Sequence, residues 1–138
     1  MKIIQVVGRS NSGKTTFIKQ LIPKLKTQGS VAVIKHLGDH EFELEEGKDT
    51  TGFFEVGADI SVGIDAHKSV VAIHNNSLDS TLEILFNQGI NFTVIEGFKQ
   101  RAFPRIVIGD LETDHCVLAN PCPDEVLVSI NAFEDFCP

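Results

Sequence analysis

Two glycines, a lysine and a threonine near the start of the chain are spaced as in a phosphate-binding loop. Gly8 is followed by four residues and then by Gly13-Lys14-Thr15. The glycines let backbone N–H groups turn inward toward a phosphate, the Lys14 ammonium reaches the terminal phosphates, and the Thr15 hydroxyl coordinates Mg²⁺. We therefore predict a nucleoside di- or triphosphate with Mg²⁺ as the ligand. The predicted nucleotide-binding residues are Gly8, Arg9, Ser10, Asn11, Ser12, Gly13, Lys14, Thr15 and Thr16.

Two questions about this motif stay open at the level of sequence. Arg9 and Thr16 lie beside the loop and either contact phosphate or ribose or take no part in binding. The motif could also be a Gly/Ser-rich turn that caps a helix, with Lys14 as a solvated surface charge. Its position between a predicted strand and a predicted helix favours the binding site, because the helix N-terminus adds its partial positive charge.

A carboxylate for the Mg²⁺ shell is predicted at the end of another buried strand, Thr93-Val94-Ile95-Glu96. Glu96 takes the place of a more frequent aspartate, and its longer side chain is expected to act through water. The alternative is a carboxylate that only caps or pairs with Lys99. Thr15 and Glu96 are thus the candidate Mg²⁺ ligands, Lys14 is the candidate catalytic group, and Lys99 is a further candidate.

Two short basic segments are further candidates for the site. Lys35 and His36 follow a second apolar run and should lie at the same sheet edge as the loop, because parallel strands end at the face where ligands bind. For His36 the alternative is a surface histidine without a ligand. Lys48 and Asp49 belong to a Gly-Lys-Asp-Thr turn that feeds a helix, where Asp49 either acts as the helix N-cap or takes a catalytic role.

The apolar pattern predicts the elements that position these residues. A buried strand over 2–7, an amphipathic helix over 14–28 and a strand over 31–34 form a βαβ unit with a right-handed crossover. Pro23 should bend the helix near Lys19 without splitting it. Further on, the pattern predicts helices over 49–56, 78–87 and 131–136, and strands over 60–64, 70–73, 92–95, 105–108, 117–119 and 126–130.

Together these elements predict one α/β domain over residues 1–138, like that of the P-loop NTPases, with a mostly parallel sheet, flanking helices and an edge hairpin extension. The acidic segment 39–46 should be a loop or an exposed hairpin. An uncovered edge would be an aggregation hazard, so we expect the hairpin and the late strands to pair in a homodimer.

Composition narrows the classes of function. Twelve Lys and Arg against 19 Asp and Glu give a net charge of -7, which leaves no electrostatic basis for binding nucleic acid. No apolar run reaches the length of a membrane span, so a cytoplasmic protein is expected. The three cysteines, Cys116, Cys122 and Cys137, fit reduced thiols, with metal binding by Cys116 and Cys122 as the less favoured alternative.

Four blocks of sequence resemble the molybdopterin-guanine dinucleotide biosynthesis protein B (MobB) family. They are the loop at 8–16, the Leu-Ile-Pro segment at 21–23, the Lys-His, Gly-Lys-Asp-Thr and Gly-Ala segments at 34–36, 47–50 and 57–58, and the Glu-Gly-Phe-Lys block at 95–99 with 104–106. The chain departs from the family in having Gly52-Phe53-Phe54 where an arginine commonly follows the Gly-Lys-Asp block. It also lacks the Asn-Lys-x-Asp guanine signature, since Asn120-Pro121-Cys122-Pro123-Asp124 has the wrong spacing.

The resemblance implies a dimeric, weakly hydrolytic GTP-binding protein that supports attachment of GMP to molybdopterin during molybdenum cofactor biosynthesis. It implies GTP or GDP and Mg²⁺ as cofactors, molybdopterin as a further bound substrate, and a molybdopterin guanylyltransferase as partner. By position, Gly8 to Thr15 would bind phosphates, Thr15 and Glu96 would serve Mg²⁺, and Lys35, His36, Lys48 and Asp49 would face the nucleotide or pterin.

Different classes of function remain open. The chain could be a slow GTPase, and no residue is clearly suited to position the attacking water. It could instead be an adaptor whose nucleotide occupancy delivers nucleotide or pterin to a transferase without useful hydrolysis, which Gly52 in place of arginine favours slightly. A small P-loop kinase is disfavoured because little sequence is left for a lid, and metal delivery because the cysteines lie late in the chain.

Overall fold

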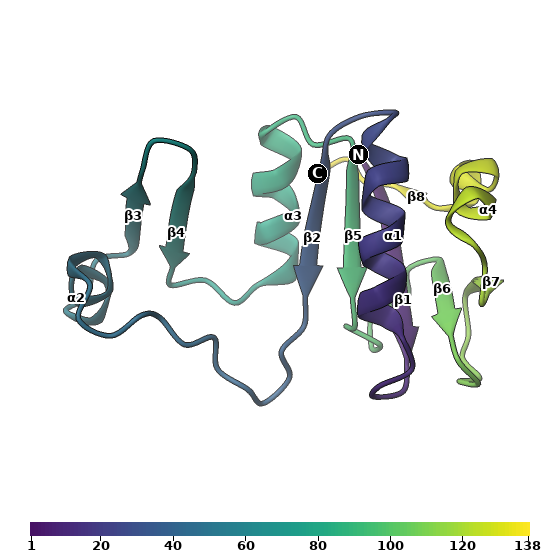
Figure 1. Ribbon diagram of the computed structural model, residues 1–138, viewed down its shortest axis with the longest axis horizontal. Helices are drawn as coiled ribbons and strands as arrows, with labels where there is room; N and C mark the ends of the chain where they lie inside the picture. Colours follow the sequence, from purple (N-terminus) through teal and green to yellow (C-terminus); the bar gives the residue numbers. More distant parts are fainter. The chain divides into compact units, whose positions relative to one another are not determined.

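The centre of the molecule is a parallel β-sheet in the computed structural model, which describes residues 1–138. The strands lie in the order β2-β5-β1-β6-β7, and every neighbouring pair along this order is parallel (Figure 1). This confirms the predicted α/β fold with a mostly parallel sheet. The strands are β1 (Lys2–Gly8), β2 (Val31–Lys35), β5 (Phe92–Glu96), β6 (Arg105–Ile108), β7 (Cys116–Ala119) and the antiparallel β8 (Glu134–Asp135), which pairs with β1.

The main core lies between this sheet and helix α1 (Lys14–Lys26). The buried side chains of α1 recur at the helical spacing expected from sequence and pack on those of β1, β5 and β6. The helix runs through Pro23 as one element, as predicted, and its C-terminal half contacts α4 (Pro123–Val128), where Lys24 pairs with Asp124 at 3.0 Å. The α1 residues of the core are Phe17, Ile18, Leu21 and Leu25.

Two of the predicted C-terminal elements are wrong. The segment predicted as a strand over 126–130 is helical, in α4 and the 3-10 turn η1 (Ile130–Ala132). Pro123 in the first helical turn, followed by two acidic residues, favours a helix start there, while three adjacent apolar residues carry no periodicity. The helix predicted over 131–136 is replaced by β8, where Lys2 bonds the Asp135 carboxylate at 2.8 Å and the Phe133 carbonyl at 3.2 Å.

The chain divides into two compact units, one formed by residues 1–36 and 81–138 and the other by residues 37–80. The second unit holds a long loop, helix α2 (Asp49–Glu55) and the antiparallel hairpin of β3 (Ile60–Ile64) and β4 (Ser69–Ile73). Helix α3 (Leu78–Asn87) follows, with the Ser77 hydroxyl accepting from Ser80 N and Gly89 ending it, as predicted. The acidic segment 39–46 is loop, and Lys48, not Asp49, is the N-cap of α2 because Asp49 is already helical.

One face of the β3–β4 hairpin is apolar and exposed. Alternate residues of the two paired strands share this face, because side chains alternate along a strand. The opposite face, with Ser61 and Ala72, is less exposed. The exposed apolar residues are Ile60, Val62, Ile64, Val71 and Ile73.

None of the helices is both long and apolar enough to cross a membrane.

Candidate functional site

The loop from Gly8 to Lys14 joins the end of β1 to the start of α1. Asn11 and Gly13 have positive φ angles of 58° and 100°, so the backbone turns back on itself before the helix begins. A Cβ on Gly8 would lie 2.4 Å from the Ile108 carbonyl oxygen and 2.6 Å from Ser12 Oγ. The close approach of β6 therefore leaves room only for glycine at position 8, which gives a steric reason for the first glycine of the motif.

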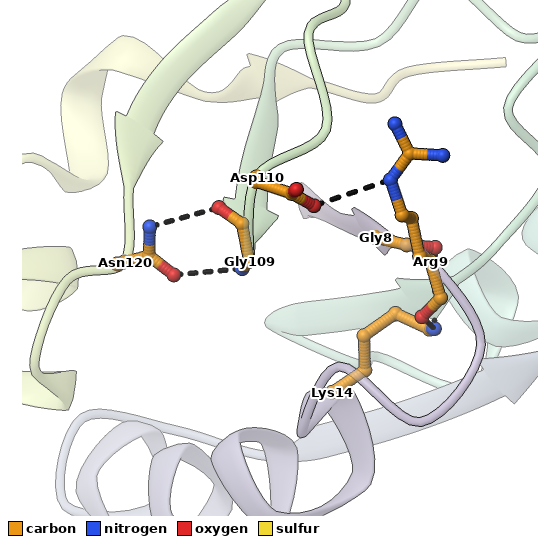
Figure 2. Close-up of polar contacts among 6 residues, drawn as sticks. All are labelled: Gly8, Arg9, Lys14, Gly109, Asp110 and Asn120. Atoms are coloured by element: carbon orange, nitrogen blue, oxygen red, sulfur yellow. Dashed lines mark hydrogen bonds and ion pairs between the residues drawn. The ribbon is translucent and has the colours of Figure 1, made fainter.

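The Lys14 side chain folds back across the loop. Its ammonium donates to the Arg9 carbonyl at 2.7 Å and to the Gly8 carbonyl at 3.3 Å (Figure 2). The positive charge of Lys14 thus lies beside the N-terminus of α1, which carries a partial positive charge of its own. A phosphate bound there would interact favourably with both charges. The predicted contact of Lys14 with phosphate stays a prediction.

Residues directly after β6, held by one directly after β7, contact the loop through Ser12 and Arg9. The Asn120 side chain accepts from Gly109 N at 2.7 Å and donates to Gly109 O at 3.0 Å (Figure 2). A Cβ on Gly109 would lie 3.3 Å from Ser12 Cβ, so this clamped backbone packs against the loop. Arg9 Nε pairs with the exposed carboxylate of Asp110 at 3.1 Å. Sequence reasoning considered Asn120 only as part of an absent guanine signature; its position directly after a strand was the available signal.

A cavity of about 400 Å³ brings the loop together with two residues from other strands. Lys35 and Glu96 are aligned in the β2–β5 register, and Lys35 Nζ lies 3.7 Å from Glu96 Oε1. Glu96 therefore pairs with Lys35 rather than with the predicted alternative Lys99, which does not line the cavity. The lining residues are Ser10, Asn11, Ser12, Gly13, Lys14, Thr15, Thr16, Lys35 and Glu96.

The donor set around this cavity suits a Mg²⁺–phosphate ligand. Thr15 offers a hydroxyl and Glu96 a carboxylate that is only 13% exposed, and both are the hard oxygen donors that Mg²⁺ prefers. Lys14 and Lys35 supply two positive charges for phosphate oxygens. Thus the structure brings together the loop, Lys35 and Glu96, which sequence reasoning placed at one sheet edge.

The remaining candidates lie elsewhere around this site or in the second unit. His36 N donates to the Glu96 carbonyl at 2.9 Å, and the His36 ring lies 4.3 Å from the Phe98 ring. Lys48 lies in the second unit, pairs with Glu45 at 3.5 Å and lines a cavity of about 520 Å³ there. Asp49 lines another cavity of that unit. The predicted roles of Lys48 and Asp49 stay predictions.

The cysteines do not form a metal site in this structure. Cys116, Cys122 and Cys137 are free and exposed. No group of three or more His, Cys, Asp or Glu residues is arranged to hold a metal ion. The less favoured alternative of metal binding by Cys116 and Cys122 therefore gains no support.

Comparison with known proteins gives consistent matches. The model of a family described as molybdopterin guanine dinucleotide synthesis protein B matches residues 3–131. A probable molybdopterin-guanine dinucleotide biosynthesis adapter protein of Bacillus subtilis is 39% identical over 77% of this chain. A putative adapter protein of the same description from Methanocaldococcus jannaschii is 32% identical over 86% of it. The chain spans only 64% and 54% of the length of these two relatives.

Solved structures show the same fold. The crystal structure of Bacillus subtilis MobB superposes with a TM-score of 0.73 at 24% identity, and the match covers 99% of this chain and 100% of that one. A crystal structure of a molybdopterin-guanine biosynthesis protein B superposes with a TM-score of 0.60 at 23% identity, over 94% and 95% of the two chains.

Proposed function

The chain belongs to the molybdopterin guanine dinucleotide synthesis protein B family, and from that premise we propose that it is a GTP-binding adapter in the biosynthesis of molybdopterin-guanine dinucleotide. The observation that carries the nucleotide part of this proposal is the cavity shared by the phosphate-binding loop, Lys35 and Glu96. The adapter part rests on its two relatives, which are described as biosynthesis adapter proteins. A molybdopterin guanylyltransferase is the proposed partner, with the pterin as a candidate ligand of the assembly.

In the proposed complex the protein mainly binds and orients the nucleotide. Loop N–H groups and the Lys14 ammonium hold the phosphates, while Thr15 and Glu96 serve Mg²⁺, which would neutralise charge on the phosphate oxygens when bound. Lys35 sits opposite Glu96 and can turn toward the terminal phosphate once Mg²⁺ satisfies the carboxylate. The preference for guanine is carried over from the family. Comparing the affinities for GTP and ATP tests this part of the proposal.

Hydrolysis by this site should be slow. Glu96 is the single carboxylate among the residues that line the cavity, and it is engaged by Lys35. No second acid or histidine lines the cavity to orient an attacking water, which is the role that accelerates hydrolysis in faster P-loop enzymes. This favours an adapter whose nucleotide occupancy matters more than its turnover; rapid GTP hydrolysis by the purified protein would contradict it.

The proposal is tested by isothermal titration of the protein with GTP, GDP and ATP, each with Mg²⁺. We expect GTP and GDP to bind and ATP to bind at least about tenfold more weakly, a difference of about 1.4 kcal/mol. Equal or tighter binding of ATP would refute the guanine assignment while leaving the phosphate-binding loop in place. If none of the three nucleotides binds, the motif is only a Gly/Ser-rich turn that caps a helix.

We also propose that the protein is a homodimer joined through its hairpin. The exposed apolar face of β3–β4 would be covered by a second copy, because an open hairpin with such a face invites pairing. Analytical ultracentrifugation should give twice the 15.1 kDa mass of one chain at micromolar concentration. Val62→Glu, on this face, should shift the species to the monomer, whereas Val128→Glu on α4, where Val128 is 88% exposed, should not. A monomeric wild-type protein would refute the dimer.

A further inference from the structure

One side chain inside the central sheet is out of place in an apolar strand. Gln5 is fully buried in β1, between the equally buried Ile4 and Val6. Its amide nitrogen donates to the carbonyls of Gly97 and Phe98, each at 2.8 Å, while its amide oxygen is buried without a partner. Burying an unpaired amide oxygen costs free energy, so the two donated bonds are the feature that accounts for a glutamine here.

A second buried polar side chain holds the same loop. Arg105 is aligned with Gln5 in the β1–β6 register and is 3% exposed. Its guanidinium donates to the carbonyls of Phe103 at 3.3 Å and Lys99 at 3.2 Å, and also to that of Arg101. Two strand residues thus hold five carbonyls of the segment 97–103, which begins directly after Glu96.

The turn that Gln5 holds has an unfavourable backbone conformation. Gly97 and Phe98 have φ angles of 92° and 51°, and the left-handed region costs a non-glycine residue such as Phe98 about 1–2 kcal/mol. Such a conformation persists only where the surroundings enforce it. Here it places the Phe98 ring 4.3 Å from the His36 ring, and it brings Gly97 so close that a Cβ there would lie 3.0 Å from His36 Cβ.

We propose that Gln5 is a positioning residue for the Mg²⁺-linked side of the nucleotide site. By fixing the turn after Glu96, it sets the direction of the Glu96 carboxylate, and it holds the Phe98 ring against the His36 ring. Gln5 is not among the residues that line the cavity, and the Glu96 carboxylate that it orients is a candidate Mg²⁺ ligand, so its effect on phosphate binding should depend on Mg²⁺. This inference rests on the proposed function, because it assigns a role within that Mg²⁺–nucleotide site.

The test compares GDP binding with and without Mg²⁺ in Gln5→Met, which keeps the side-chain length and removes both donors. We expect its GDP affinity without Mg²⁺ to stay within about twofold of wild type. The gain in GDP affinity on adding Mg²⁺, called the Mg²⁺ gain below, should fall by about tenfold, as for residues that orient metal ligands. Glu96→Gln should lose the same gain, and the double variant should lose little more, since coupled residues are not additive. Ile3→Val, two residues along the same strand face, is the matched control and should keep the gain.

A ligand-free measurement separates this inference from the proposed function. In the NMR spectrum, the shift that the Phe98 ring imposes on the His36 ring protons should be lost in Gln5→Met and kept in Ile3→Val. If Gln5→Met does not fold, Gln5→Asn, which shortens the amide by one methylene, should give the same two results. Retention of the Mg²⁺ gain, or an equal loss of affinity with and without Mg²⁺, would overturn the role of Gln5. Failure of wild type to bind any nucleotide would refute the proposed function. If the His36 ring protons of Gln5→Met then kept the shift seen in wild type, the positioning by Gln5 would be overturned as well.

Discussion

Replacing Lys14 by alanine is expected to lower the affinity for Mg²⁺–GTP by at least about 100-fold. The ammonium lies over the loop, bonded to the carbonyls of Arg9 and Gly8, where phosphate oxygens would be its strongest partners. Hydrogen bonds between charged groups contribute about 1.5–3 kcal/mol, and 100-fold corresponds to about 2.7 kcal/mol. Isothermal titration with GTP measures the effect directly.

The control for this variant is another lysine of the same helix. Lys19→Ala removes the same charge from the exposed side of α1 and should leave GTP affinity within about twofold, since solvent and salt screen distant surface charges. The midpoint of urea denaturation should be nearly equal for both variants, because Lys14 makes only two local bonds to loop carbonyls. If Lys14→Ala binds GTP as tightly as Lys19→Ala does, the loop is not the phosphate site.

Gly8→Ala should impair both the loop and the sheet. The added methyl group would lie 2.4 Å from a backbone oxygen of β6, and neither strand end can move without disturbing the β1–β6 pairing. Overpacking of this kind costs about 1–3 kcal/mol of unfolding free energy. GTP binding should be lost together with this stability, and urea denaturation and titration on the same sample measure both.

Gly52→Ala is the matched control for that substitution. Gly52 lies inside α2, and a Cβ there would meet no atom within 4 Å. Alanine in place of a helical glycine should raise the unfolding free energy by up to about 1 kcal/mol. Opposite signs for the two glycine substitutions are therefore expected, and a neutral Gly8→Ala would show that β1 and β6 are not as close as the structure has them.

The turn between β1 and α1 could be predicted from sequence because its glycines, Lys14 and Thr15 lie within eight adjacent positions. The meeting of Lys35 and Glu96 was also accessible, since it follows from the rule that parallel strands end at one edge. The clamp of Asn120 on Gly109 and the support of the turn by Gln5 were not. These contacts join residues from separate strands, and only the order β5-β1-β6-β7 brings them together.

The end of the chain shows the second reason why prediction from sequence failed. Three consecutive apolar residues, Val126 to Val128, fit a short buried strand and a helix equally well, and the proline before them was the deciding signal. The two-residue strand β8 carries no pattern of its own, and it forms because Lys2 and Ile3 offer it a partner at the start of β1. Short elements fixed by distant partners are therefore the ones that local patterns miss.

The strand order has a consequence for how the protein folds during synthesis. Strands β1 and β2 are not neighbours, because β5 lies between them. No pair of the central sheet can form until residues 92–96 have left the ribosome, whereas the hairpin of residues 60–73 closes locally. Strands β1 and β2 and the apolar face of α1 therefore stay exposed without their sheet partners, and we expect the nascent chain to depend on holding chaperones during that interval.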